Sequence, residues 1–188
     1  MTLTIPTRLT IFRILLIPVL VVVFYLPYGW TNIAAAAVFI LGAATDWADG
    51  WIARRYGMYS AFGAFLDPVA DKLTVAFALL LVVERHDTPG MALLSAVIIG
   101  REITISALRE WMAQIGASRS VAVHMLGKLK TATQMTAIPF LLYDGALFGV
   151  IDTRIWGTVL ILVACVLTIW SMVYYLQRAL PEIRAKAK

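Results

Sequence analysis

Four aspartates lie close together in this sequence as two pairs, Asp46 with Asp49 and Asp67 with Asp71. Each helical residue turns the chain by about 100°, so the members of each pair fall on one face of a helix. Two neighbouring helices can therefore present two carboxylates each across a common cleft. Four carboxylates in one place repel one another, and hard oxygen ligands of this kind suit Mg²⁺ or Mn²⁺ rather than Zn²⁺. The spacing predicts a site for divalent metal ions.

Carboxylates and metal ions in this arrangement can support a displacement at phosphorus. Two divalent ions about 3.5–4 Å apart stabilise the attacking and the leaving oxygen, and a nearby carboxylate can take the proton of an attacking hydroxyl. Arg54 lies on the same rim, where it can offset phosphate charge. Gly50, Ala53 and Gly63 keep large side chains off these faces, so that a helix or a ligand can approach the backbone closely.

Two other interpretations of the aspartates stay open at this point: a polar network between helices, and a proton or cation path in a transporter. Pro68 bears on where the second helix begins, because proline favours the first helical position. We therefore expect a helix that begins at Pro68 with Asp67 as its N-cap, which still leaves Asp67 beside Asp71.

The elements that carry these residues are strongly apolar. The chain has 188 residues, which fits one domain over residues 1–188, and 61% of them are hydrophobic. Only 14% are charged, whereas a soluble domain carries about a quarter. The net charge of +5 is not gathered into one stripe, so we expect no nucleic-acid partner and a surface that faces membrane lipid.

Apolar runs predict an all-α integral membrane protein with six transmembrane helices, at residues 9–27, 32–54, 67–84, 89–112, 128–143 and 154–177. Residues 1–13 are mixed apolar and basic, and we expect them to form an interfacial helix. Among the ends of these spans, Arg85 and Arg154 are the basic residues on one side, and the others lie opposite. Because positive charge is retained inside, both termini are predicted in the cytoplasm.

The aspartates belong to a longer pattern, Asp46-x2-Asp49-Gly50-x2-Ala53-Arg54-x8-Gly63-x3-Asp67-x3-Asp71. At every fixed position this run resembles the signature of the CDP-alcohol phosphotransferase family. The resemblance implies six transmembrane helices, usually in a homodimer, with a polar cavity open to the cytoplasm.

The same resemblance implies roles for the signature residues. Asp46, Asp49 and Asp67 would bind two divalent cations, Mg²⁺ or Mn²⁺, and Asp71 would be the catalytic base that also touches metal. The residues around the CDP moiety would be Asp49, Gly50, Ala53, Arg54 and Gly63.

Further segments resemble one bacterial branch of this family: TIPTRLTIFRILLIP at the start, GAFLDPVADKLTVA, REITISALREWMA at 101–113 and GKLKTATQM at 127–135. Thr7 departs from that branch, since many of its members have asparagine there. The likeness implies that the phosphatidyl group of CDP-diacylglycerol passes to glycerol 3-phosphate, giving phosphatidylglycerophosphate and CMP. It places the reaction in the bacterial cytoplasmic (inner) membrane.

A phosphorylated acceptor is a dianion, so it needs fixed cations apart from the metal site. We predict that Arg101, Arg109, Lys128 and Lys130 bind its phosphate. The alternative for Arg101 is an ion pair with Glu102, which we do not expect because adjacent helical residues do not face each other. The alternative for the other three is to mark the cytoplasmic ends of their spans.

Three competing functions follow from other uses of intramembrane acids. The first is a sister enzyme with another acceptor, such as inositol phosphate, serine or a second lipid. The second is a cation or proton transporter, although no inverted repeat is visible in the sequence. The third is a prenyltransferase-type membrane enzyme, against which the spacing of Gly50, Ala53, Arg54 and Gly63 argues.

Overall fold

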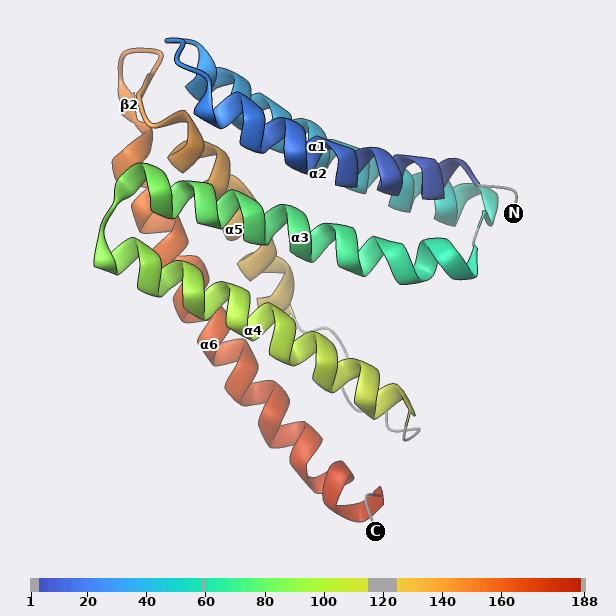
Figure 1. Cartoon of the computed structure of the whole chain (residues 1–188). Coiled ribbons are helices and arrows are strands. Elements are labelled where there is room, and N and C mark those ends of the chain that lie inside the picture. The colour runs from blue at the N-terminus through green and yellow to red at the C-terminus, as the bar shows by residue number, and fades with distance from the viewer. Residues whose placement is uncertain (1–3, 59, 115–124, 187–188) are drawn as a thin grey trace.

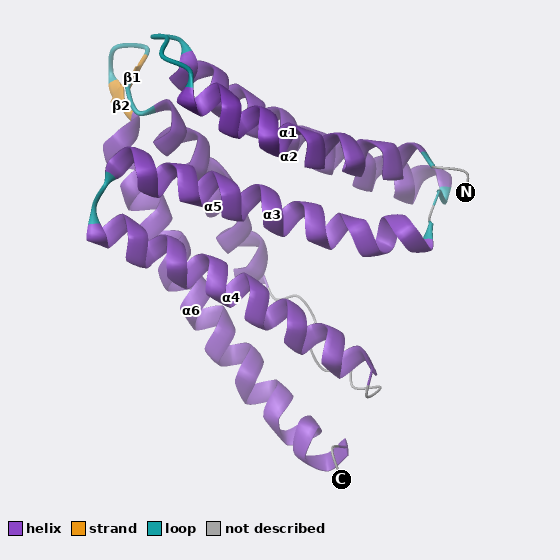
Figure 2. Ribbon diagram, viewed as in Figure 1, coloured by secondary structure: helices purple, strands orange, loops and turns teal. Residues whose placement is uncertain are grey.

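The computed structural model describes residues 4–58, 60–114 and 125–186, and these form six helices and one short hairpin (Figure 2). The helices are α1 (Ile5–Tyr25), α2 (Thr31–Tyr56), α3 (Ala61–His86), α4 (Pro89–Gln114), α5 (Met125–Tyr143) and α6 (Thr153–Lys186). Strands β1 (Ala146–Leu147) and β2 (Ile151–Asp152) pair antiparallel between α5 and α6. The prediction of six helices is confirmed, and the hairpin is the one departure from an all-α chain in the part described.

Four of the helices are long and apolar enough to cross a membrane: α1, α2, α4 and the Thr153–Pro181 part of α6. They fit an integral membrane protein. The other two helices are α3 and α5. α3 carries Asp67, Asp71 and Lys72 along its length, and α5 has only 19 residues. That all six helices span the bilayer stays a prediction.

The start of α3 differs from the sequence-based expectation. Ser60 is the N-cap, and its hydroxyl oxygen accepts a hydrogen bond from the Gly63 backbone N–H at 2.9 Å. Asp67 is therefore not the N-cap, and Pro68 lies inside the helix. Pro68 lacks the N–H that would bond to the carbonyl of Ala64, yet the helix continues past it. The start of α3 is therefore set by the Ser60 cap, which lies earlier in the chain than Pro68.

The first helix also begins early, at Ile5, with proline in its first turn. Residues 5–13 are the first turns of α1 and not a separate helix, while residues 1–3 lie outside the described part. Whether these turns lie at the membrane interface stays a prediction.

The helices meet at one end of the molecule and diverge toward the other (Figure 1). We call the first the closed end, which is formed by Tyr25, Thr31, His86, Pro89, Tyr143 and Thr153. We call the second the open end, which is formed by Ile5, Tyr56, Ala61, Gln114, Met125 and Lys186. α1 packs on α2 and α3, α5 packs on α2 and α6, and α4 packs on α3 and α6. Away from the closed end, α4 and α6 run in a different direction from α1, α2 and α3.

Hydrogen bonds from charged side chains join the helices at the closed end, next to the apolar core. Leu141 and Leu142 lie in the last turn of α5, where backbone carbonyls have no donor from their own helix. Arg85 donates to the Leu142 carbonyl, and His86 Nε2 donates to the Leu141 carbonyl at 3.2 Å. Arg154 Nε donates to Nδ1 of the same histidine at 3.3 Å. Three helices are thus joined by side chains that complete the end of α5.

Candidate metal and substrate site

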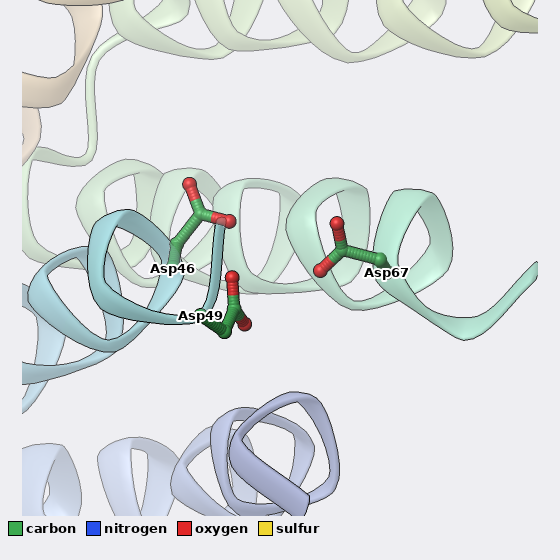
Figure 3. A group of neighbouring side chains, drawn as sticks. All are labelled: Asp46, Asp49 and Asp67. Carbon is green, nitrogen blue, oxygen red and sulfur yellow. The ribbon is translucent and has the colours of Figure 1, made fainter. Parts of the chain in front are cut away.

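The two aspartate pairs come together where α2 and α3 run side by side. Asp46, Asp49 and Asp67 each offer one carboxylate oxygen, and these three oxygens lie within 4.8 Å of one another. Figure 3 shows the three side chains converging from the two helices. Asp71 joins them through a shared cation, described next. The expectation that two helices present carboxylates to one place is met.

Arg13 of α1 is that shared cation. Its Nη1 lies 2.9 Å from Asp46 Oδ1 and 3.4 Å from Asp67 Oδ1, and also contacts Asp71 Oδ1. Its Nη2 lies 2.5 Å from Asp49 Oδ2. Arg13 is only 1% exposed, and its two terminal nitrogens contact all four carboxylates, while its buried Nε has no hydrogen-bond partner among the described residues. The site therefore has a third wall, α1, that the sequence pattern did not assign to it.

The donor set fits a divalent cation of the hard type. Its ligand atoms are carboxylate oxygens, which Mg²⁺ and Mn²⁺ prefer. The side chains of Asp46, Asp67 and Asp71 are 42%, 45% and 43% exposed although they also contact a buried arginine. Four carboxylates against one guanidinium leave an excess of negative charge on the side that a ligand can reach. Metal binding itself stays a prediction.

A cavity of about 300 Å³ opens beside the aspartates, between α1, α2 and α3. It is lined by all five residues predicted to surround CDP, which are Asp49, Gly50, Ala53, Arg54 and Gly63. It is also lined by Thr7 and Thr10 of α1. The structure thus gathers the whole predicted group into one pocket, with α1 as an additional wall.

Glycine at position 63 allows α1 to approach α3 closely. The hydroxyls of Thr7 and Ser60 are hydrogen-bonded at 2.9 Å, directly above this residue. A Cβ added at Gly63 would lie 2.8 Å from both hydroxyl oxygens, closer than real Cβ atoms come. At Gly50 an added Cβ would lie 3.2 Å from Arg54 Nη1, so this arginine lies across the bare backbone of its own helix.

A second polar cavity, of about 150 Å³, lies between α4, α5 and α6. Three of the four cations predicted to bind the acceptor phosphate line it: Arg101, Arg109 and Lys130. Lys128 is exposed and is not among the residues that line it. The structure brings the first three together and leaves Lys128 apart.

Glu102 offsets part of the positive charge of this second cavity. Its Oε1 accepts a hydrogen bond from Lys130 Nζ and lies 3.7 Å from Arg101 Nη1. The expectation that Arg101 does not approach Glu102 was wrong, because both long side chains bend toward the same cavity. Arg101 Nη2 also donates to Ser171 Oγ on α6 at 2.8 Å.

A larger cleft of about 640 Å³ connects these features between α3 and α4. It is lined by Asp71 from the aspartate cluster and by Glu102 and Arg109 from the second cavity. Lys72 also lines it and donates a hydrogen bond to Ser106 of α4, which ties the two helices together. A molecule in this cleft can touch Asp71 of the aspartate cluster and Arg109 of the second cavity at once.

Comparison with known proteins bears on this geometry. The pattern of a family described as CDP-alcohol phosphatidyltransferase matches residues 3–170. The chain belongs to this family. A protein of Salmonella choleraesuis (strain SC-B67) is 51% identical over 93% of this chain and 94% of its own length. One of Escherichia coli (strain K12) is 50% identical over 95% of this chain and 96% of its own. Both are named CDP-diacylglycerol--glycerol-3-phosphate 3-phosphatidyltransferase.

Within this CDP-alcohol phosphatidyltransferase, none of the residues that sequence reasoning missed is a fixed position of the signature. They are Arg13 and Thr10 on α1, Ser60 at the cap of α3, and Ser171 on α6. One signal was present for Arg13, because a charged residue inside an apolar run is by default a functional candidate. The three hydroxyl residues carry no such signal, since their roles depend on which helices are neighbours.

Proposed function

We propose that this chain transfers the phosphatidyl group of CDP-diacylglycerol to glycerol 3-phosphate and releases CMP. One observation carries the proposal. Asp49 and Asp67 line the pocket that holds the signature's predicted CDP residues, and Asp71 lines a cleft that shares Glu102 and Arg109 with the cavity of three cations. The names of relatives about half identical to this chain support the same reaction. The product is phosphatidylglycerophosphate.

The donor side of the reaction belongs to α2 and α3. Gly50, Ala53 and Gly63 leave backbone exposed for the CDP moiety, and Arg54 offsets charge on its phosphates. Asp46, Asp49 and Asp67, together with Asp71, would hold two Mg²⁺ or Mn²⁺ ions. When bound, such ions neutralise charge on the diphosphate and on the departing CMP.

The acceptor side belongs to α4 and α5. Arg101, Arg109 and Lys130 hold the phosphate of glycerol 3-phosphate, while Glu102 keeps two of these cations in place. The glycerol end then reaches through the cleft toward Asp71.

Asp71 takes the proton of the primary hydroxyl, and that oxygen attacks the phosphorus that carries the diacylglycerol. A new phosphorus–oxygen bond forms to the acceptor, and the bond to the oxygen of the CMP phosphate breaks. CMP leaves with the electron pair, so no covalent enzyme intermediate is needed.

The placement in the membrane follows from the same division of residues. We place α3 and α5 across the bilayer with the other four helices, in the bacterial inner membrane. The open end, with its cleft and most basic residues, faces the cytoplasm together with both termini. Under this proposal the lipid substrate reaches the site from the inner leaflet and glycerol 3-phosphate from the cytoplasm, and the working unit is a homodimer.

Product identification tests the proposal. Purified protein in detergent micelles receives CDP-diacylglycerol with glycerol 3-phosphate, inositol phosphate or serine, each with Mg²⁺, Mn²⁺ or a chelator. We expect CMP and phosphatidylglycerophosphate with glycerol 3-phosphate alone, and no turnover with the chelator. A lipid product from another acceptor would favour a sister enzyme. Cation flux in vesicles without CMP release would favour a transporter.

A further inference from the structure

The reaction scheme above gives Arg13 no task, although it is the cation most deeply placed in the site. Arg13 is 1% exposed among apolar helices, and a guanidinium in such a place is strongly unfavourable unless it is paired. Its two terminal nitrogens reach all four carboxylates, two on α2 and two on α3. α1 therefore supplies a fixed positive charge that both aspartate-bearing helices share.

Arg13 approaches the carboxylates from the buried side of the cluster. Its side chain is 2% exposed, whereas the side chains of Asp46, Asp67 and Asp71 are 42–45% exposed. The cavity against which it lies holds only about 10 Å³ and is walled by Phe39, Gly42, Ala43, Thr74 and Met135. The guanidinium has little room to leave, while the aspartates keep oxygen surface toward the pocket and the cleft.

The charges explain what this arrangement does before any metal arrives. Four carboxylates close together would push α2 and α3 apart, and one guanidinium in contact with all four offsets part of that repulsion. When all four carboxylates are ionised, the positive charge of Arg13 cancels one of their four negative charges and leaves a net charge of −3. The cluster thus stays gathered yet still attracts divalent cations.

We propose that Arg13 is a positioning residue, an internal cation that holds the four carboxylates in one place in the metal-free protein. The inference rests on the proposed function only in taking these carboxylates as the metal ligands. Two interactions would then hold the carboxylates of α2 and α3 together. One is the contact with Arg13, and the other is the contact with bound metal ions. Without Arg13, the repulsion among these four carboxylates is offset mainly by bound metal.

Thermal unfolding of the purified full chain tests this, with chelator or with saturating Mn²⁺. The variants are Arg13→Gln and Arg13→Lys, and the matched control is Arg8→Gln, an exposed arginine of the same helix that makes none of the four contacts. We expect Arg13→Gln to lower the metal-free midpoint by about 6–15 °C. Mn²⁺ should restore most of this loss, with Arg13→Lys intermediate and the control like wild type.

A double variant separates charge from packing. Adding Asp46→Asn to Arg13→Gln removes one carboxylate together with the cation, so it should recover part of the metal-free midpoint that Arg13→Gln loses. The inference is overturned if Mn²⁺ shifts the midpoint of Arg13→Gln no more than that of wild type, or if the double variant falls further. If Arg13→Gln can be prepared only with Mn²⁺ and precipitates on chelation while the control does not, the inference is supported. These readouts need no turnover, so the absence of phosphatidyl transfer would sink the proposed function without deciding this one.

Discussion

The closed and open ends of this helix bundle use charged residues in opposite ways. At the closed end, Arg85 and His86 each satisfy a backbone carbonyl that the last turn of α5 leaves without a donor. At the open end, four carboxylates converge on the single guanidinium of Arg13. At the closed end each of these donors has one acceptor, so the contacts join helices and leave neither group for a ligand. An excess of one charge, held on a rigid frame, is what a metal or phosphate site requires.

A substitution at Asp71 gives the strongest test of the difference between the two ends, because we expect it to have the largest effect on turnover. Asp71→Asn keeps the shape of the side chain and removes the proposed base, so kcat should fall by about 10²–10⁴-fold. The protein should stay folded, because the variant also relieves repulsion among the carboxylates. CMP release and the thermal midpoint measure both quantities. Full activity in this variant would remove Asp71 from the role of base.

The second test concerns the cations of the cavity that we propose binds the acceptor, where the chain offers a matched pair of lysines. Lys130→Gln should raise KM for glycerol 3-phosphate by about 10–100-fold, since a charge-assisted hydrogen bond is lost. KM for CDP-diacylglycerol should hardly change. Lys128→Gln should have an effect below about twofold, because Lys128 does not line that cavity. Equal effects at the two lysines would contradict the assignment of the cavity.

The third test concerns the contact between α1 and α3 beside the pocket that we propose binds CDP. Gly63→Ala places a methyl group against the hydroxyls of Thr7 and Ser60, and overpacking of this kind costs about 1–3 kcal/mol. We expect a lower thermal midpoint and a higher KM for CDP-diacylglycerol. Gly100→Ala is the control, because nothing lies within 4 Å of its added Cβ. A midpoint for Gly63→Ala at or above that of the control would show that the approach of α1 is not tight.

The smallest effect on function is expected at the closed end. His86→Leu leaves the Leu141 carbonyl without its donor, which costs about 1–3 kcal/mol of stability. The thermal midpoint should fall by a few degrees while kcat and both KM values stay unchanged. Circular dichroism during heating and the CMP assay give the two answers. A change in KM for either substrate would mean that the two ends are not independent.

Much of the fold was predictable because apolar runs and turn residues fix helix positions locally. All six helices overlap the spans that the hydropathy pattern places, and most boundaries differ by no more than four residues. The exceptions are α3, which begins six residues before the predicted span, and α6, which ends nine residues after it. The start of α3 was missed because Ser60 competes with Pro68 for the boundary, and the serine cap forms earlier in the chain. The hairpin between α5 and α6 has only two residues in each strand, too short for a strand pattern.

The site was predictable only where the spacing of residues carries the information. Helical periodicity brings together residues of one helix or of an α2–α3 hairpin, so the meeting of the aspartates was anticipated from the residues themselves. The group predicted to surround CDP came instead from the resemblance of the signature to a known family, and that role stays a prediction. It does not say which other helix covers them, and for that reason the role of Arg13 on α1 was missed. The same limit applies to Lys128 and Lys130, whose sequence neighbourhood is alike but whose surroundings differ.

The connection between α2 and α3, residues 57–60, has a consequence for how this chain can vary among its relatives. It ends α2 at Gly57 in a left-handed conformation and sets Ser60, whose hydroxyl contacts both Gly63 and Thr7. Loops commonly tolerate added or deleted residues, but a change of length here would shift one half of the signature against the other. Insertions and deletions should therefore accumulate at the hairpin after α5 and be rare between Gly57 and Ser60.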